Sequence, residues 1–271
     1  MNPIITASLT GPAATSKDTP AMPRNPEEIA EAAKGAYEAG AAVLHIHLRD
    51  NDDFTADLDV AKRTVELVRE KCGGIVQLST GGGMEYEVRM KLVEAKPAMA
   101  TLNPATMTVG DNEFRNPPKL MYKLAERMLE LGIKPEIEIY DTGHIPLMLD
   151  LLKKGLVTEP LQVSFIMGMK GGMPADPMLL SYCVRELPPN TSWQVIAIAK
   201  ANLPLTTIGL AMGGNARVGL EDTIYVRPKE LATSNAQLVE QLVGVARSMN
   251  LQPATVDEVG ERLKLSPELV R

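Results

Sequence analysis

The sequence is poor in cysteine and contains no long apolar run. Its two cysteines, Cys72 and Cys183, stand in unrelated contexts, which excludes a disulfide framework and a cysteine-based zinc site. We expect both to be small buried residues. No apolar stretch approaches the roughly 20 residues of a membrane span, and MNPIITASLT lacks a basic region followed by an apolar core. We therefore expect a cytoplasmic protein with no membrane partner.

Basic residues are also too few for a nucleic-acid surface. The 271 residues include 28 Lys and Arg against 34 Asp and Glu, which gives a net charge of -6 without any visible basic cluster. Charge runs and low-complexity tracts are missing as well, while 45% of the residues are hydrophobic and 23% are charged. This composition is typical of an ordinary globular protein that binds no nucleic acid.

Short β-prone runs alternate with helical patterns along nearly the whole chain. The runs, about eight in all, cover residues 3–9, 42–48, 74–79, 98–103, 135–140, 161–167, 193–199 and 216–220. Helical patterns are found at 57–71, 117–131, 143–154, 176–186 and 234–249. A further helix starts clearly after the first run, with Asn25 as N-cap, Pro26 in the first turn and Glu28 at the third position. Residues 203–212 suit either a helix or a strand.

Repeated β-α units imply a parallel sheet, and about eight of them in about 220 residues favour closure into a (β/α)8 TIM barrel. An open doubly wound sheet is the alternative. Its dinucleotide-binding form requires G-x-G-x-x-G after the first strand, but SLTGPAATSK has one glycine there, and no P-loop motif occurs. We therefore expect one α/β barrel domain over residues 1–271. A C-terminal helix at 255–269 is expected to pack on its outside, available for an oligomer contact.

In a barrel the active site lies where the strands end, and in this sequence those positions are strongly polar. They hold Thr10, His45, His47, Arg49, Asp50, Ser79, Thr101, Asn103, Glu136, Glu138, Tyr140, Arg217, Glu221 and Asp222. Glu136 and Glu138 share one face of a strand, where two acidic side chains are costly unless they are paired or used. Glu221 and Asp222 adjoin and point to alternate sides, so one can bind a metal ion while the other faces a substrate.

The motif HIHLRD places His45 and His47 on the same side of a strand. Two imidazoles and one carboxylate with open positions make a catalytic zinc or ferrous site, and redox-inert zinc is the preferred interpretation. On spacing alone, a hydrogen-bonded pair in a polar pocket is the alternative. An amidohydrolase-type barrel needs further histidines, and only His144 remains, so we expect a carboxylate as third ligand. Arg49 and Asp50 suit a structural ion pair as well as a functional one.

Taken in order, these motifs resemble those of the β-keto acid cleavage enzyme family. The resemblance spans most of the chain and rests on ITASLTG, TPAMPRNPEEIAEAA, AGAAVLHIHLRD, QLSTGGG, MATLNPATMTVGD, KPEIEIYDTGH, VSFIMGMKGGMP, GNARVGLEDTIYV and SNAQLV. Each motif is weak alone, whereas so many in one order are specific together. The resemblance implies a zinc-dependent (β/α)8 barrel, usually a homotetramer, that converts a β-keto acid and acetyl-CoA into acetoacetate and a new acyl-CoA.

The resemblance also implies residue roles. It makes His45, His47 and Glu221 the zinc ligands and assigns proton abstraction to Asp222 with Glu138. Arg217 assists electrostatically. The substrate carboxylate contacts Ser79, Gly82, Thr101 and Asn103. In the implied chemistry, a base removes a proton from the α-carbon, and the carbanion attacks the acetyl-CoA thioester. The released CoA thiolate adds to the old keto carbon, and a retro-Claisen cleavage liberates acetoacetate. No covalent enzyme intermediate is required, in keeping with the lack of an evident nucleophilic cysteine or lysine.

Two positions depart from the family pattern. Ala13 stands where the amine-substrate member carries a Glu, which favours a neutral aliphatic β-keto acid over a cationic one. AIAKANLP replaces the more usual loop with glycine and arginine after the seventh strand, and Lys200 there suits an anionic substrate tail, a CoA phosphate or simply solvent. Two rival functions stay open: a metal-dependent C–C lyase or aldolase without CoA, and a zinc-binding barrel that senses a ligand without catalysis.

Overall fold

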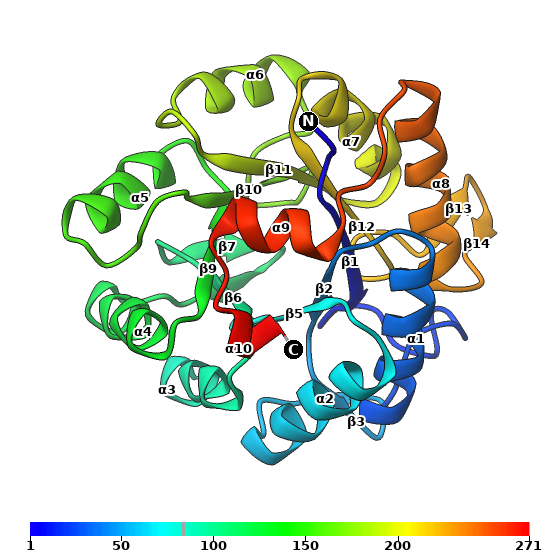
Figure 1. Cartoon of the computed structure of the whole chain (residues 1–271), viewed down its shortest axis with the longest axis horizontal. Helices are drawn as coiled ribbons and strands as arrows, with labels where there is room; N and C mark the ends of the chain where they lie inside the picture. Colours follow the sequence, from blue (N-terminus) through cyan, green and yellow to red (C-terminus); the bar gives the residue numbers. More distant parts are fainter. Residues whose placement is uncertain (83–84, 271) are drawn as a thin grey trace.

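The computed structural model describes residues 1–82 and 85–270, and it confirms the predicted barrel. Parallel strands close on themselves in the order β1-β12-β11-β10-β9-β6-β5-β2 (Figure 1). Their bounds are β1 (Ile5–Thr10), β2 (Val43–Ile46), β5 (Ile75–Leu78), β6 (Met99–Leu102), β9 (Lys134–Ile139), β10 (Gln162–Met167), β11 (Ser192–Ala197) and β12 (Asn215–Val218). The open sheet is excluded, because β1 pairs with both β2 and β12.

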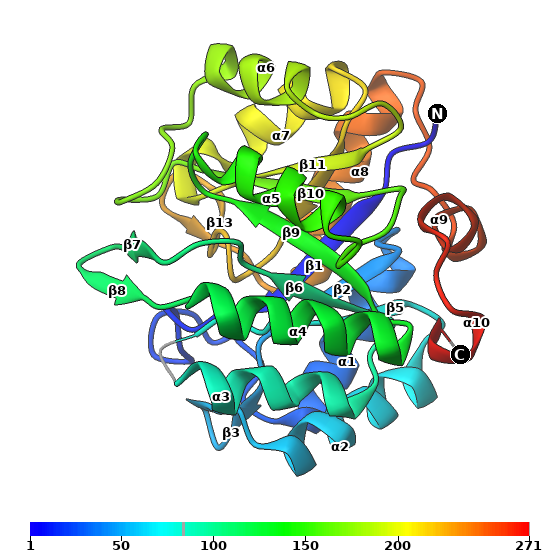
Figure 2. The same ribbon diagram turned by 90° about the vertical axis from the view of Figure 1, so that its left-hand side faces the viewer.

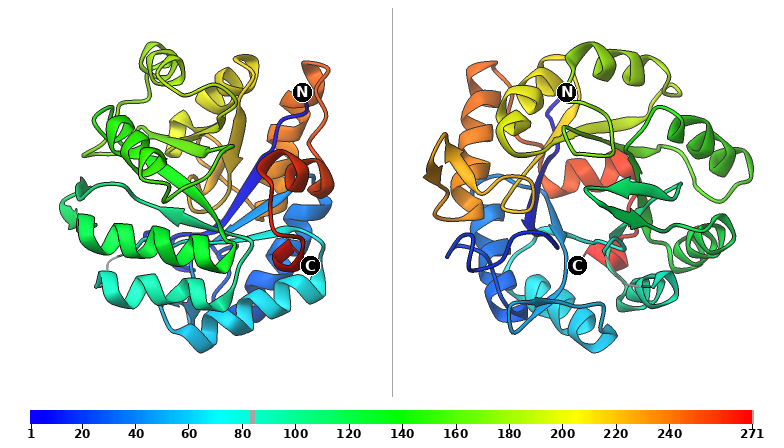
Figure 3. Two further views of the ribbon diagram at one scale, coloured as in Figure 1. Left: turned by 60° about the vertical axis from the view of Figure 1, so that its left-hand side comes forward. Right: turned by 180° about the vertical axis from the view of Figure 1, so that it is seen from behind.

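Helices surround the barrel between the strands (Figure 1, Figure 3). They are α1 (Pro26–Glu38), α2 (Leu58–Lys71), α3 (Tyr86–Arg89), the 3-10 helix η1 (Met90–Ala95), α4 (Pro118–Leu131), α5 (His144–Lys153), α6 (Pro177–Arg185), α7 (Asn202–Ala211) and α8 (Asn235–Ser248). The predicted start of α1 is confirmed, since the Asn25 side chain accepts a hydrogen bond from the N–H of Glu28. Of the ambiguous residues 203–212, all but Met212, the C-cap residue, lie in α7. No helix was predicted over α3 and η1.

The C-terminal segment covers the end of the barrel at which the strands begin. The predicted helix divides into α9 (Val256–Leu263) and α10 (Pro267–Val270), because Lys264 between them adopts a left-handed conformation with φ 53°. Figure 1 shows α9 lying across the barrel end, and the N–H of Ala254 donates to the carbonyl of Pro3 just before β1. The buried apolar side chains of α9 belong to the same core cluster as those of β6 and β9. The segment therefore seals the barrel base.

Short antiparallel hairpins follow three strands in the described part of the chain. They are β3–β4 (Arg49–Asp50, Asp53–Phe54), β7–β8 (Met107–Val109, Asn112–Phe114) and β13–β14 (Tyr225–Arg227, Glu230–Leu231). Figure 2 shows β7 and β8 projecting from the end of the barrel opposite to α9 and α10. Strands of two or three residues are too short to carry an alternation pattern, so the sequence did not predict them. The hairpins stand at the strand-end face, where a barrel carries its site.

Two smaller expectations concern cysteine and the membrane. Cys183 is buried as expected, but Cys72 is only half-buried: it is the C-cap residue of α2 and packs against the edge of a core cluster. Across the residues that the structure describes, no helix has the length and apolar character needed to cross a bilayer.

Candidate metal centre and active site

His45, His47 and Glu221 converge at the strand-end face of the barrel. Nε2 of His45 lies 3.2 Å from Oε2 of Glu221, and Nε2 of His47 lies 3.5 Å from Oε1. One potential ligand atom from each residue lies within 4.8 Å of the others. The third histidine, His144, instead accepts a hydrogen bond from the backbone N–H of Tyr140 at 3.3 Å. The structure thus brings the three expected ligands together and leaves the spare histidine outside, against an amidohydrolase-type site.

Two atoms of this cluster are buried without a hydrogen bond. Nε2 of His45 and Oε2 of Glu221 face each other, yet neither makes a hydrogen bond with any described residue. Buried polar atoms are nearly always hydrogen-bonded, and two such atoms facing each other could hold a cation between them. Two imidazoles and one carboxylate are also a ligand set of catalytic zinc, which keeps one position open for substrate. The residues present therefore fit zinc.

Arg217 and Asp222 form a buried ion pair beside the cluster. Arg217, on β12, donates to the two carboxylate oxygens of Asp222 at 2.6 and 3.0 Å and to Oε1 of Glu221 at 2.9 Å. The Ser8 hydroxyl donates to Oδ2 of Asp222 at 2.7 Å. Burial raises the pKa of Asp222 above its ordinary value, although Arg217 opposes the shift. Oδ1 of Asp222 accepts one hydrogen bond from the described residues, so it retains a lone pair for a substrate proton.

Glu138 is a second buried carboxylate of the site. It lies on β9 at 5% exposure, and burial raises its pKa to about 7 against the opposing charge of Arg217. The Tyr140 hydroxyl donates to its Oε2 at 3.5 Å. Within the described residues, no hydrogen bond joins Glu138 to Asp222. The structure therefore does not join the two expected members of a base pair directly, and each is instead coupled electrostatically to Arg217.

The expected carboxylate-binding residues lie after β5 and at the end of β6. Oγ of Ser79 accepts from the N–H of Gly81 at 3.1 Å, and Oγ1 of Thr101 accepts from the N–H of Thr80 at 2.9 Å. These two hydroxyls therefore shape the glycine-rich turn. Asn103 is 2% exposed, and neither of its side-chain polar atoms has a hydrogen-bond partner in the described chain. Such atoms are suited to a polar ligand.

Only glycine fits at position 82. Its φ is 136°, and a Cβ at this position would lie 2.3 Å from Cζ of Phe54 on β4. The Phe54 ring also packs against the ring of His47, with 5.7 Å between centroids. The β3–β4 hairpin therefore covers both the glycine turn and one expected metal ligand.

Arg89 fixes the same turn, and sequence reasoning missed it. Its guanidinium lies between the rings of Tyr86 and Phe114, 4.8 and 4.7 Å from their centroids. It donates to the carbonyl of Thr80 and to that of Arg115, both at 2.6 Å. One buried side chain thus ties the glycine-rich turn to the β7–β8 hairpin. A single arginine in a segment without a predicted element carries no signal of this role.

Arg49 has a structural role, with a partner other than the expected one. Asp50 is exposed, and Arg49 Nη1 lies 3.5 Å from Oδ1 of Asp52. The second amino group donates to the carbonyl of Gly11 at 2.6 Å and to that of Ala14. The sharp turn of the β3–β4 hairpin brings Asp52 back to Arg49, so adjacency in sequence was a poor guide. This buried guanidinium holds the loop after β1.

Asn235, in the SNAQLV motif, joins the ends of β1 and β12 beside the cluster of His45, His47 and Glu221. Its Nδ2 donates to the carbonyl of Leu9 at 3.1 Å, and its Oδ1 accepts from the N–H of Leu220 at 2.9 Å. Leu220 directly precedes Glu221, so the first turn of α8 fixes the position of an expected metal ligand. The sequence marked this motif only through the family resemblance.

The two positions that depart from the family pattern lie on exposed loops. Ala13 is exposed after β1, and Lys200 is exposed on the 3-10 helix η2 (Ala199–Ala201). Ala199 adopts a left-handed conformation with φ 54°, a region that favours glycine. Its N–H donates to the carbonyl of Asp222 at 2.7 Å, so the altered loop still supports the site.

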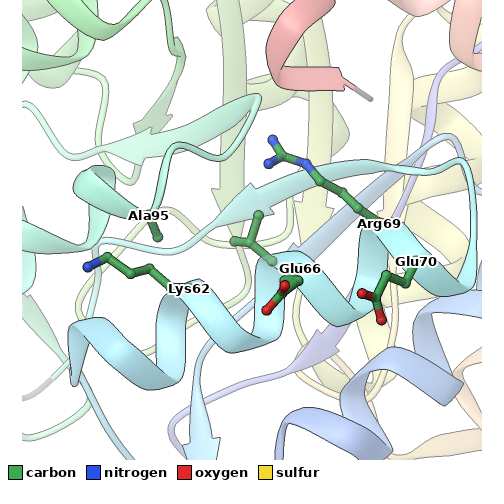
Figure 4. Close-up of a pocket in the computed structure, with 6 residues that line it drawn as sticks. Lys62, Glu66, Arg69, Glu70 and Ala95 are labelled. Carbon is green, nitrogen blue, oxygen red and sulfur yellow. The ribbon is translucent and has the colours of Figure 1, made fainter.

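A separate hollow of about 480 Å³ lies on the outer face of the barrel, beside α2. It is lined by Lys62, Val65, Glu66, Arg69, Glu70 and Ala95 (Figure 4). Arg69 donates to the carbonyls of Lys96 and Leu269, which ties α2 to the C-terminal segment. None of the lining residues belongs to the cluster at the strand ends, and their charges are of both signs.

Several known proteins are similar in sequence to this chain over nearly its whole length. A family model described as beta-keto acid cleavage enzyme matches residues 3–265. The chain is 36% identical to a 3-keto-5-aminohexanoate cleavage enzyme of Acetoanaerobium sticklandii, over 97% of this chain and 98% of that protein. It is 34% identical to a 3-oxoadipate:acetyl-CoA acetyltransferase of Cupriavidus necator, over 97% and 94%. The apo structure of ObcA shares the fold, with a TM-score of 0.78 at 19% identity, over 91% of this chain and 66% of that one.

Proposed function

The chain belongs to the beta-keto acid cleavage enzyme family, and from that membership we propose a transferase that condenses a β-keto acid with acetyl-CoA. Its products are acetoacetate and a new acyl-CoA. The observation that carries the proposal is the convergence of His45, His47 and Glu221 next to the buried pair of Arg217 and Asp222. The relative named 3-oxoadipate:acetyl-CoA acetyltransferase supports acetyl-CoA as the co-substrate.

Zinc is the metal we propose for this site, held by His45, His47 and Glu221. Bound there, zinc would supply Lewis acidity that acidifies the carbon between the keto and carboxylate groups of the substrate. The two buried atoms without hydrogen bonds, His45 Nε2 and Glu221 Oε2, support the assignment of these residues as ligands. The cleavage involves no net electron transfer, which is why a redox-inert ion is preferred.

Asp222 is the proposed base, because Arg217 and Ser8 hold its carboxylate in one orientation and leave a lone pair on Oδ1. Burial would lower the pKa of Arg217, but Asp222 and Glu221 outweigh burial and raise it well above its ordinary value. Arg217 thus stays cationic and can stabilise oxyanions that develop on the substrate. Glu138 is proposed as the second carboxylate of the base pair, since it is buried on β9 and coupled to the same arginine.

The substrate carboxylate is proposed to contact Ser79, Gly82, Thr101 and Asn103, of which Asn103 offers two buried atoms without partners. Ala13 has no charge to offer to a cationic substrate tail, so a neutral aliphatic chain is proposed. Lys200 is exposed and is proposed to remain in solvent. We further propose that the protein is cytoplasmic and forms a homotetramer. Sedimentation of the purified protein tests the oligomeric state.

The proposal is tested with a panel of β-keto acids incubated with zinc-loaded protein, with and without acetyl-CoA. Acetoacetate should form only when acetyl-CoA is present, together with the acyl-CoA of the β-keto acid supplied. Cleavage of the panel without acetyl-CoA would instead support a CoA-independent lyase or aldolase. Binding of a β-keto acid with no turnover under either condition would support a ligand sensor.

A further inference from the structure

The barrel interior contains a layer of polar side chains next to the expected metal ligands. Thr6, Gln77, Glu136 and Gln194 come from β1, β5, β9 and β11, which alternate in the order of the barrel. Each is at most 1% exposed. Such layers are usually filled by bulky branched residues, and burying a carboxylate with two amides costs free energy unless they hydrogen-bond. We therefore expect this polar layer to have a specific role.

Hydrogen bonds connect this layer to one metal ligand. Nε2 of Gln77 donates to Oε2 of Glu136 at 2.8 Å, and Nε2 of Gln194 donates to the same oxygen at 3.1 Å. On its other side, Oε1 of Gln77 lies 2.7 Å from Nδ1 of His45. The strands place these groups in register, since His45 on β2 pairs directly with Gln77 on β5.

The direction of these hydrogen bonds follows from Glu136. A carboxylate only accepts, so Gln77 must turn its amide N–H2 towards Glu136 and its carbonyl towards His45. The proton of the His45 imidazole is then held on Nδ1, which leaves the lone pair of Nε2 directed at Glu221. Metal-binding histidines commonly donate their second ring N–H in this way. Nδ1 of His47 has no hydrogen-bond partner in the described chain, so the arrangement serves His45.

We infer that Gln77, oriented by Glu136, is a positioning residue that holds His45 in the tautomer whose Nε2 can bind a metal ion. The inference rests on the proposed metal centre and extends it to two residues outside the proposed ligand set. Gln194 supports Glu136 from the opposite side and accepts a hydrogen bond from Thr6 at 3.0 Å. Among the described residues it makes no hydrogen bond with His45, which makes it a matched control.

The experiment compares Gln77→Met with Gln194→Met. Each variant removes one amide donor from Glu136, but only the first removes the acceptor of His45 Nδ1. Zinc affinity, measured by competition with a coloured chelator, should fall about 10- to 100-fold for Gln77→Met and change less than about threefold for Gln194→Met. Long-range ¹H–¹⁵N spectra of the zinc-free wild type at about pH 9, where histidine is neutral, should show His45 protonated on Nδ1. Gln77→Met should lose this preference.

Two results would overturn the inference. One is unchanged zinc affinity in a Gln77→Met variant that folds, as judged by circular dichroism. The other is a wild-type His45 protonated on Nε2, and this measurement decides the matter even if Gln77→Met fails to fold. A wild-type protein that binds no zinc would contradict the proposed metal centre, while the tautomer of His45 still tests the role of Gln77 separately.

Discussion

The backbone of Gly11 lies directly against the side chain of Glu221. A Cβ built on Gly11 would be 2.5 Å from Cγ and 3.2 Å from Cα of Glu221. Both distances are shorter than normal contacts, so only glycine fits here while Glu221 stays beside His45 and His47. A residue that directly follows β1 therefore sets the place of the proposed metal ligand that follows β12.

Gly11→Ala should displace Glu221 and lower both zinc affinity and turnover by about tenfold or more, because one ligand loses its position. Gly244→Ala is the control, since nothing lies within 4 Å of a Cβ at that helical glycine. It should leave zinc affinity unchanged and stabilise the fold by up to about 1 kcal/mol. Chelator competition and an acetoacetate assay give the two readouts. Normal zinc affinity in Gly11→Ala would contradict the steric argument.

Asp222→Asn should lower kcat by about 100-fold or more, because an amide cannot take up the substrate proton. Zinc binding should be largely retained, since His45, His47 and Glu221 are untouched. Ser8→Ala removes only one hydrogen bond to Asp222 and should cost much less. The measurements are acetoacetate formation and the zinc content of each purified variant. Unchanged turnover in Asp222→Asn would refute its assignment as base.

Removal of zinc by a chelator should abolish turnover and lower the thermal midpoint, and added zinc should restore both. Zinc at about 100 times its dissociation constant should stabilise the folded state by about 2.7 kcal/mol, which is on the order of several degrees for a chain of this size. His45→Ala and Glu221→Ala should eliminate this zinc-dependent shift, as scanning calorimetry can show. A shift that persists in both variants would mean that zinc binds elsewhere.

Arg89→Lys should raise the KM for the β-keto acid about tenfold and leave zinc affinity unchanged. A lysine ammonium cannot reproduce the planar fork that donates to the carbonyls of Thr80 and Arg115, so the glycine-rich turn loses its anchor. The control is Arg185→Lys on the surface of α6, where the guanidinium contacts Glu186. Steady-state kinetics separate KM from kcat. A loss of zinc binding in Arg89→Lys would show that the turn does more than hold the substrate.

Lys134→Met should stabilise the protein at pH 7 by about 2 kcal/mol. Burial lowers the pKa of Lys134 from 10.5 to about 8, so the folded state binds this proton more weakly than the unfolded chain. The resulting penalty is fully present below pH 8 and is relieved as the pH rises towards 10.5. The substitution also forfeits the hydrogen bond to the carbonyl of Thr158 at 3.2 Å.

Urea unfolding at pH 7 and pH 10 provides the measurement for Lys134. The difference in unfolding free energy between variant and wild type should narrow at the higher pH. Taking this difference at each pH cancels the contribution of all the other titratable groups, which both proteins share. Lys17→Met, at an exposed position, is the control for the loss of a lysine. A difference that is equal at both pH values would contradict burial of a charged amine.

Much of the barrel could be predicted from the sequence because its signals are local. A strand such as β10 shows as a short apolar run, and α1 shows its start through Asn25 and Pro26, within a few residues of chain. The elements that were missed lack such signals. The hairpins are too short for a pattern, and α3 is a helix of four residues that continues as the 3-10 helix η1.

The site residues that could be predicted are likewise those with a local signal in the sequence. His45 and His47 stood out because two imidazoles at that spacing are rare, and Glu136 stood out as an acid inside a strand. Gln77 and Gln194 did not, since a single amide in an apolar run carries no mark of its partners. Arg49 was assigned the wrong neighbour, because a turn and not the chain order decided which carboxylate it meets.

The sequence by itself determined the alternation of strands and helices and, through its motifs, the family; it favoured a closed barrel, which the pairing of β1 with both β2 and β12 decided. These depend on periodicity and composition over short stretches. Only the tertiary structure decided what lies beside what: Glu221 against Gly11, Asp222 held by Arg217 and Ser8, and Gln77 between His45 and Glu136. The physical reason is barrel closure, which pairs β1 with β12 and turns residues from both ends of the chain towards one point.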